Sequence, residues 1–316
     1  MTQVVPDTIC PLCGAKDARF VERIPYQRIW ETLSADWGVT LSPDVLDDHT
    51  PGDATRLFEC VDCGLQYFLD AVAGDARFYS ELSAGSGSYY VEGKWDFHET
   101  LRLVPAGALL LDIACAAGSF LQLAARSGVQ AKGIDINPVG VAQAKAKGLD
   151  VECAPLDAFS AANAGQFDVV TAFQVLEHVD DCRSFLRSAW RCVKPGGRLV
   201  LTIPNRNRCF YSDFEPLDCP PHHLTRWAER QCHKVAEVVG AKGFTVVCEQ
   251  TTMADCRDLL RRRISSSKPN AFLVRLIARL VLSSVLYAVY RRSGLLARLE
   301  LWRMGMLFTL EKPQSD

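Results

Sequence analysis

One stretch constrains the fold of this chain more than any other: residues 109–120, LLLDIACAAGSF. Its apolar run from Leu109 to Ile113, with Asp112 inside it, is typical of a buried parallel strand. A turn of small residues (114–118) and an apolar helix that contains Phe120 follow directly. Such a turn lets a ligand lie close to the backbone, and the helix N-terminal N–H groups point toward it. The stretch predicts a nucleotide-type loop, and the alternative is an ordinary turn of an α/β domain.

The next segments favour the nucleotide. Residues 130–137 (QAKGIDIN) predict a second strand that leads to Asp135, about 20 residues beyond the loop, where a carboxylate can accept both ribose hydroxyls of an adenosine. A third strand over 151–155 leads to Asp157, which is placed to meet an adenine amino group. A fourth strand is predicted over 167–173. The order of strands and helices predicts a doubly wound α/β sheet with an adenosine-containing ligand.

Four motifs in this order carry a family resemblance. The chain resembles the class I S-adenosylmethionine-dependent methyltransferases, in particular the branch that acts on small molecules and glycans, roughly over residues 103–313. The motifs are LDIACAAGSF (111–120), GIDINP (133–138), FDVVTAFQVLEH (167–178) and KPGG (194–197). The resemblance implies a Rossmann-like seven-stranded sheet with helices on both faces, an antiparallel final strand over 305–312, and S-adenosylmethionine as cofactor.

The loop departs from the family pattern at two positions. Ala114 and Ala116 stand where the family usually has glycine, whereas Gly118 is retained. Each methyl group narrows the cofactor cleft and disfavours a positive φ. Because alanine is the least costly replacement for glycine, we expect a working cofactor site.

The resemblance also assigns further cofactor contacts. It places Asp112 where the amino group of the methionine part is held, through the loop backbone or a water, although the same carboxylate could instead fix the N–H groups of the turn. It makes Gln174 face the methyl-transfer cavity. The complete set of expected cofactor-binding residues is Asp112, Ala114, Ala116, Gly118, Asp135, Ile136, Asp157, Ala158 and Gln174.

Two histidines are candidate general bases. His178 follows the fourth strand and can take a proton from an acceptor hydroxyl near neutral pH, or it only holds its loop. Related methyltransferases carry a His-Leu-x-x-aromatic string whose His points toward the acceptor, and residues 223–227 (HLTRW) match it. This match ranks His223 level with His178. Thr225 then predicts the N-cap of a helix over 226–239.

Two CxxCG segments near the N-terminus predict a metal site. Cys10 and Cys13 form one pair, and Cys60 and Cys63 form the other. Two thiolates on each tight turn can face one ion, so the pairs complete a tetrahedral four-sulfur site that suits structural zinc. The alternative is two unrelated redox or buried pairs. The long segment between the two cysteine pairs contains a predicted helix with Ile29 and Leu33. The N-terminal part is therefore predicted to be a zinc-ribbon-like domain with this segment inserted between its two cysteine pairs.

Charge limits what this N-terminal part can bind. Residues 1–95 hold 7 Lys and Arg against 15 Asp and Glu, which opposes contact with a phosphate backbone. We therefore expect the N-terminal part to stabilise the fold and to line one side of the substrate cleft, and we expect no nucleic-acid partner. The aromatic linker that follows provides candidate lid residues or interdomain packing: Tyr79, Tyr89, Tyr90 and Trp95.

The expected domains are residues 1–95 and the methyltransferase domain 96–316, with a helical insertion over 251–303. The insertion has arginine-rich flanks and is interpreted as a helical cap over the sheet edge or a homodimer contact; the alternative is a peripheral membrane or lipid-linked substrate contact. Its apolar run is too short to span a bilayer. The start of the chain does not resemble a signal peptide, and an odd number of cysteines, 13, suits a reducing cytoplasm.

The sequence predicts transfer of a methyl group to a small molecule, a sugar or a lipid- or nucleotide-linked glycan, most often at oxygen. The first alternative is an RNA-base methyltransferase that uses the zinc domain for recognition. The second, which Ala114 and Ala116 suggest, is a protein that binds S-adenosylmethionine without catalysis.

Overall fold

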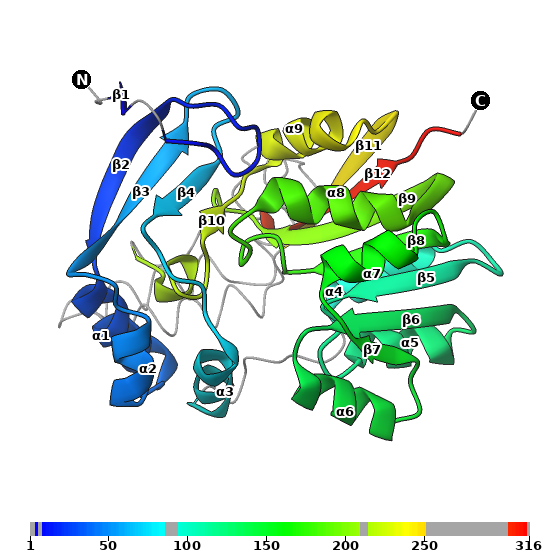
Figure 1. Cartoon of the computed structure of the whole chain (residues 1–316), viewed down its shortest axis with the longest axis horizontal. Helices are drawn as coiled ribbons and strands as arrows, with labels where there is room; N and C mark the ends of the chain where they lie inside the picture. The colour runs from blue at the N-terminus through cyan, green and yellow to red at the C-terminus, as the bar shows by residue number, and fades with distance from the viewer. Residues whose placement is uncertain (1–3, 6–7, 86–93, 209–213, 251–302, 315–316) are drawn as a thin grey trace, which may run out of the picture.

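The computed structural model describes residues 4–5, 8–85, 94–208, 214–250 and 303–314, which form two sheets joined by a shared core (Figure 1). Tyr89, Tyr90 and residues 251–302 lie outside the described residues, so the expectations for them stay predictions. No helix in the described part of the chain has both the length and the apolar character needed to cross a membrane.

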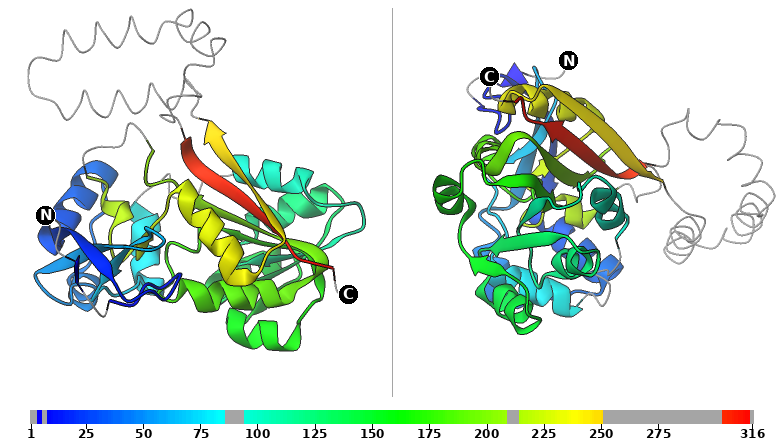
Figure 2. Two further views of the ribbon diagram at one scale, coloured as in Figure 1. Left: turned by 90° about the horizontal axis from the view of Figure 1, so that it is seen from above. Right: turned by 90° about the vertical axis from the view of Figure 1, so that its right-hand side faces the viewer.

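The larger sheet has seven strands in the order β11-β12-β9-β8-β5-β6-β7, and this confirms the predicted fold class. All neighbouring strands are parallel except at β12, which pairs antiparallel with both β9 and β11, as expected for the final strand (Figure 2). The strands are β5 (Leu109–Ile113), β6 (Gln130–Asp135), β7 (Val151–Cys153), β8 (Phe167–Phe173), β9 (Val193–Pro204), β11 (Gly243–Gln250) and β12 (Arg303–Glu311).

Helices cover both faces of this sheet because its strands are apolar on both sides. In β5, Leu110 packs with Phe97 and Phe120 on one face, whereas Leu111 belongs to the cluster that contains Leu186 on the other. The helices are α4 (Trp95–Arg102), α5 (Ser119–Arg126), α6 (Pro138–Ala146), α7 (Leu156–Ala162), α8 (Cys182–Cys192) and α9 (Glu229–Val239). Strand order reverses between β5 and β8, and open α/β sheets bind ligands at the carboxyl ends of the strands beside such a reversal.

The smaller sheet has the order β1-β2-β3-β4-β10. Its strands are β1 (Val4–Val5), β2 (Ala18–Pro25), β3 (Ala54–Cys60), β4 (Gln66–Leu69) and β10 (Thr225–Arg226); the helices beside it are α1 (Tyr26–Trp37), α2 (Pro43–Asp48) and α3 (Ala76–Gly85). The helix predicted around Ile29 and Leu33 is therefore present as α1, with both side chains buried. A short 3-10 helix, η1 (Pro216–Asp218), precedes β10.

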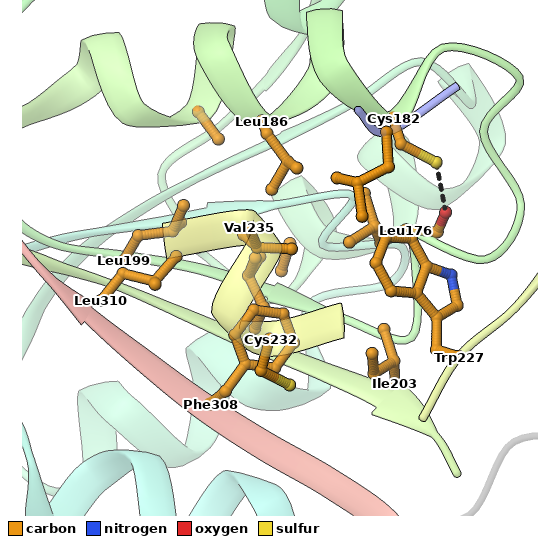
Figure 3. Close-up of a cluster of buried hydrophobic side chains, with 14 of the residues drawn as sticks. Leu176, Cys182, Leu186, Leu199, Ile203, Trp227, Cys232, Val235, Phe308 and Leu310 are labelled. Carbon is orange, nitrogen blue, oxygen red and sulfur yellow. Dashed lines mark hydrogen bonds between the residues drawn. The ribbon is translucent and has the colours of Figure 1, made fainter. Parts of the chain in front are cut away.

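One buried cluster joins the two sheets. Leu12 and Phe58 from the N-terminal part belong to the same cluster as Trp227 and Phe308. Figure 3 shows Trp227, which is 1% exposed, among the side chains that α8 and α9 pack onto the larger sheet. The N-terminal part is thus not a separate globule, because its core continues under the two helices.

One local prediction was wrong. Thr225 is not the N-cap of a helix from residue 226: it is buried in β10, where its hydroxyl accepts a hydrogen bond from Trp227 Nε1 at 2.8 Å, and α9 starts at Glu229.

Candidate functional site

The loop between β5 and α5 has the backbone conformation that glycine favours. Ala114 has a φ of 58° and Ala116 a φ of 47°, and both residues are exposed. Gly118 has a φ of 78°, and a Cβ there would lie 2.4 Å from Leu149 Cδ1. The two alanines therefore keep the left-handed geometry of the family's glycine positions and carry its steric cost, which is about 1–2 kcal/mol for each L-residue.

Replacing Ala116 by Gly should relieve this strain. We expect the Ala116→Gly variant to gain about 1 kcal/mol in the free energy of unfolding, because the methyl group is removed at a positive φ. Denaturant unfolding measures the change. The matched control is Ala125→Gly, at an exposed position of the regular helix α5, which should lose about 1 kcal/mol. Equal losses in both variants would show that the loop is not strained.

Asp135 lies against this loop at the carboxyl end of β6. Its Oδ2 accepts a hydrogen bond from the Ala116 N–H at 2.8 Å, and its Oδ1 accepts one from the Asn137 N–H at 2.7 Å. The next side chain, Ile136, is 76% exposed. The structure thus brings Asp135, Ile136 and the loop together, as the sequence predicts, and each carboxylate oxygen keeps a further lone pair for a ligand.

Asp157 and Ala158 lie farther along the same sheet edge. Both are exposed in the first turn of α7, which follows β7, the neighbour of β6. Gln174 directly follows β8 and has a φ of 54°, and its N–H donates to Thr202 O at 3.0 Å. These residues share the carboxyl edge of the sheet with the loop.

Two carboxyl groups are buried behind the loop. Asp112 is 2% exposed and accepts a hydrogen bond from Thr171 Oγ1 at 2.9 Å, and burial raises its pKa to about 8. Asp96, from α4, accepts from Thr202 Oγ1 at 3.0 Å, and burial raises its pKa as well. Two buried acids near each other favour a ligand with positive charge. Sequence reasoning missed Asp96, since nothing in α4 marks it.

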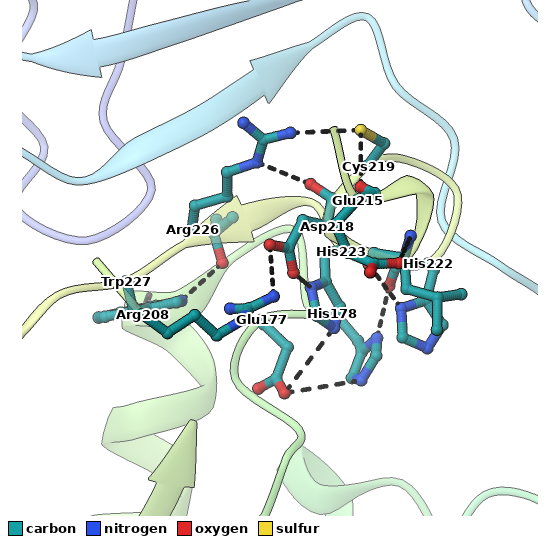
Figure 4. A network of polar contacts seen from close by, with 12 residues as sticks. Glu177, His178, Arg208, Glu215, Asp218, Cys219, His222, His223, Arg226 and Trp227 are labelled. Atoms are coloured by element: carbon teal, nitrogen blue, oxygen red, sulfur yellow. Dashed lines mark hydrogen bonds and ion pairs between the residues drawn. The ribbon is translucent and has the colours of Figure 1, made fainter. Parts of the chain in front are cut away.

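Three histidines meet where the segment after β8 packs on the segment before β10. The Leu224 N–H donates to Glu177 O at 2.8 Å, which draws the two segments together. One ring nitrogen of each of His178, His222 and His223 lies within 4.8 Å of those of the other two (Figure 4). The structure therefore brings together both predicted base candidates and adds His222, which sequence reasoning missed although it precedes His223.

Each imidazole is oriented through its Nδ1. His178 Nδ1 lies 2.5 Å from His222 O, and His222 Nδ1 lies 2.8 Å from Leu217 O. His223 Nδ1 lies 3.2 Å from Asp218 Oδ1, and Arg208 holds the other oxygen of Asp218 at 2.5 Å. Carbonyl and carboxylate oxygens only accept, so the Nδ1 atoms carry the protons and the Nε2 atoms present lone pairs.

Burial controls the charge of these rings. It lowers the pKa of His178 to about 3, lowers the pKa of His222 well below its ordinary value and lowers that of His223. The rings are therefore neutral at pH 7. Tyr79, from α3, places its hydroxyl 3.0 Å from His178 Nδ1, so this predicted lid residue reaches the site.

Glu177 lies beside the same rings. Its side chain is 1% exposed, and burial raises its pKa to about 8. A cavity of about 10 Å³, roughly the space of one water, lies next to Glu177 and His223 and is also lined by Asp218, Arg208 and Trp227. Sequence reasoning missed Glu177 and Asp218, although Glu177 lies within the quoted motif FDVVTAFQVLEH.

The four cysteines form one cluster. Cys10 Sγ lies 3.6 Å from Cys63 Sγ, Cys13 Sγ lies 3.5 Å from Cys60 Sγ, and all four sulfurs lie within 4.8 Å of one another. The alternative of two unrelated pairs is thereby wrong. Hydrogen bonding with Cys63 lowers the pKa of Cys10 to about 5, a value that favours a thiolate.

The two turns that carry the cysteines contact helices of the larger sheet. Gly14 and Gly64 have φ values of 75° and 68°, and a Cβ on them would meet Arg183 at 2.5 Å and Arg230 at 1.7 Å. Only glycine lets these guanidinium groups approach. Cys63 O also accepts hydrogen bonds from Gln231 Nε2 at 2.7 Å and Arg230 Nε at 3.1 Å, so the cluster holds the N-terminal part against α9.

Comparisons with known proteins agree with this fold. Among curated proteins, the chain is 38% identical over 111 residues to "Ubiquinone biosynthesis O-methyltransferase" of Xanthomonas axonopodis, a match that covers 33% of this chain and 46% of the relative. It is 39% identical over 112 residues to the protein of the same name from Pseudomonas entomophila, covering 34% and 48%. The chain thus spans about half the length of the curated relatives it matches.

A solved structure and a family model complete the comparison. A structure described as a SAM-dependent methyltransferase from Archaeoglobus fulgidus is 16% identical with a TM-score of 0.49 and covers 68% of this chain and 91% of its own. The family model described as "Methyltransferase domain" matches residues 90–250, which make up half of this chain. The chain therefore belongs to the methyltransferase-domain family.

Proposed function

We propose that this protein is an S-adenosylmethionine-dependent methyltransferase that acts on a hydroxyl oxygen of a small molecule, sugar or lipid- or nucleotide-linked glycan. The observation that carries the proposal is the Asp135 carboxylate, which is held 2.8 Å from the Ala116 N–H at the carboxyl edge of a sheet whose strand order reverses there. The curated relatives are named O-methyltransferases, and this supports oxygen as the acceptor atom.

The residues present fit this cofactor, which supplies a methyl group on a positively charged sulfur. Asp135 would accept the ribose hydroxyls, and Ile136 would cover the adenine, whose amino edge Asp157 and Ala158 would meet. The backbone of the loop would line the methionine part. Asp96 and Asp112 are buried carboxyl groups with raised pKa values, and each would gain a partner for its negative charge when the cationic groups bind. Gln174 would face the acceptor.

Methyl transfer to a hydroxyl also requires a proton acceptor, and we assign this role to His223, with His178 as the second candidate. Asp218 fixes the tautomer of His223 and would stabilise the imidazolium that forms, while its own charge is held by Arg208. His178 is the weaker base because burial lowers its pKa to about 3. The dry surroundings and the alignment of the reactants account for most of the remaining catalysis.

We also propose that Cys10, Cys13, Cys60 and Cys63 hold a structural zinc ion. Four sulfurs within 4.8 Å match the ligand set of a closed tetrahedral site, which leaves no position for a substrate. The acidic N-terminal part speaks against a nucleic-acid partner. The described cysteines are all free of disulfides, which suits a reducing compartment such as the cytoplasm.

The test is methyl transfer from S-adenosylmethionine with a labelled methyl group to a panel of phenols, sugars and RNA. We expect labelled methyl ether products from a hydroxyl acceptor and none from RNA, and calorimetry should show cofactor binding. Labelled RNA would establish the alternative of an RNA-base methyltransferase. Tight cofactor binding without any transfer would establish a binding protein, and no binding would overturn the proposal.

Cofactor affinity should depend on pH through Asp112. Its pKa in the free protein is raised to about 8 by burial, so below pH 8 a cationic ligand must displace a proton from it. We expect affinity to rise up to about tenfold per pH unit from pH 6 toward pH 8 and then to level off. Calorimetry in buffers of different ionisation enthalpy measures the released proton. Asp112→Asn should bind more weakly and lose this pH dependence; a wild-type affinity that falls toward pH 8 would contradict the assignment.

A further inference from the structure

The histidine cluster and Glu177 together have the composition of a metal site. We propose that Glu177, His178, His222 and His223 bind a divalent transition-metal ion, separate from the four-cysteine cluster. Imidazole and carboxylate ligands suit ions such as Zn²⁺, Co²⁺ and Ni²⁺. The binding claim depends only on these side chains, and it stands whether or not the protein transfers methyl groups.

The strongest observation is the isolation of Glu177. Its side chain is 1% exposed, and among the described residues neither of its carboxylate oxygens has a hydrogen-bond partner. Leaving a carboxylate buried without a partner costs several kcal/mol. Its nearest polar neighbours are His178 Nε2 at 3.9 Å and His223 Nε2 at 4.0 Å, both to Oε1 (Figure 4).

Those neighbours cannot satisfy the carboxylate by themselves. The Nδ1 atoms of His178 and His223 face a carbonyl and a carboxylate oxygen, so their protons lie there and their Nε2 atoms carry lone pairs. Lone pairs therefore face the Glu177 carboxyl group across a distance of about 4 Å. Because burial raises the pKa of Glu177 to about 8, an ion that binds here displaces the proton of this group. A cation placed among them satisfies every one of these atoms at once.

The outer contacts match those of known metal sites. Metal-binding histidines usually donate their second N–H to a carbonyl or carboxylate, which fixes the ring and leaves the other nitrogen for the ion. Here His178 faces His222 O, His222 faces Leu217 O and His223 faces Asp218. Burial also keeps the rings neutral, which is the state that ligates.

The separations are slightly wider than those of an occupied site. Ligands about 2.1 Å from a tetrahedral zinc ion lie roughly 3.4 Å apart, compared with 3.9–4.8 Å here. Small rotations of the side chains close this difference. The cavity of about 10 Å³ beside Glu177 and His223 has room for one water molecule as a further ligand.

One consequence rests on the proposed function. An ion at this position would lower the pKa of an acceptor hydroxyl or a water bound to it. His178 and His223 would then act as ligands in place of the base role assigned above, and the proton of the hydroxyl would pass to water.

The experiment compares metal uptake by the full-length protein and its variants. The protein is stripped with a chelator, reloaded with Zn²⁺, dialysed and analysed for metal. We expect about two equivalents in the wild type and about one in Glu177→Gln, which keeps the shape and removes the charge. His98→Ala, an exposed position on α4, is the matched control and should keep both. X-ray absorption spectra at the zinc edge should show one ion bound by sulfur and one ion bound by nitrogen and oxygen.

Stability distinguishes a lost ligand from a damaged fold. Without metal, Glu177→Gln should melt at the same temperature as the wild type or higher, because a buried acidic group without hydrogen-bond partners is gone. With Zn²⁺, only the wild type should gain stability from the second ion. One equivalent in the wild type, all of it bound to sulfur, would overturn the proposal. If the wild type binds one ion and still binds the cofactor, the metal site is wrong and the proposed function is unaffected. If the wild type binds two ions but no cofactor, the metal site is supported and the proposed function is wrong.

Discussion

Replacing Cys63 by Ser should release the proposed zinc ion and strongly destabilise the protein. Structural zinc contributes about 10–16 kcal/mol of binding free energy in small domains, so even partial loss exceeds the effect of an ordinary substitution. The change also loosens the turn whose carbonyl holds Gln231 and Arg230, and through them α9. We expect the melting temperature to fall by more than about 10 °C, with unfolding that starts in the N-terminal part.

A chelating dye measures the released ion, and calorimetry measures the melting temperature. Cys153→Ser is the matched control, because Cys153 is exposed at the end of β7 and belongs to no cluster of metal-ligating residues that the described part of the chain contains. It should retain all zinc and melt like the wild type. A wild-type protein purified without metal, or a Cys63→Ser variant of unchanged stability, would disprove the structural zinc.

The second large effect concerns Asp135. Asp135→Ala should weaken S-adenosylmethionine binding by roughly 100-fold, because two hydrogen bonds to a charged group are worth about 3 kcal/mol or more. The same carboxylate accepts the N–H groups of Ala116 and Asn137, so about 1–3 kcal/mol of stability should be lost as well. Calorimetric titration and denaturant unfolding separate the two effects.

Two further variants make this result interpretable. Asp135→Asn keeps one carbonyl oxygen for the loop and should recover much of the stability while binding remains weak. Asp150→Ala removes an exposed carboxylate that precedes β7 and should change neither quantity by more than about 0.5 kcal/mol. If Asp135→Ala bound the cofactor as tightly as the wild type, the crevice beside Ala116 would not be the adenosine site.

The sequence predicts the cofactor half well because its signals are local. The bounds of β5 and β8 coincide with the apolar runs that predict them, since parallel strands buried on both faces need continuous apolar residues. Asp135 is the last residue of β6, so its place at the sheet edge is fixed by the strand itself. The positive φ of Ala114 and Ala116 agrees with a loop that glycine would suit better.

The acceptor side could not be predicted in the same way. Glu177 and His223 lie far apart along the chain, and they meet only because residues 177 and 224 share a backbone hydrogen bond. Thr225 was misinterpreted for a related reason: its residue type suits a helix cap, but pairing with β4 makes it a strand residue. Contacts between distant segments leave no periodic pattern in the sequence, and so Asp218 and His222 carried no signal.

The pairing of β10 with β4 also affects how the protein must be synthesised. The edge of the N-terminal sheet is completed by residues 225–226, which the ribosome adds only after most of the larger sheet. Until then the smaller sheet has an open strand edge and an uncovered apolar face, and both can associate with other nascent chains. The N-terminal part is the first part of the chain to leave the ribosome. We nevertheless expect it to need a chaperone, or the proposed zinc ion, until residues 225–226 have been added.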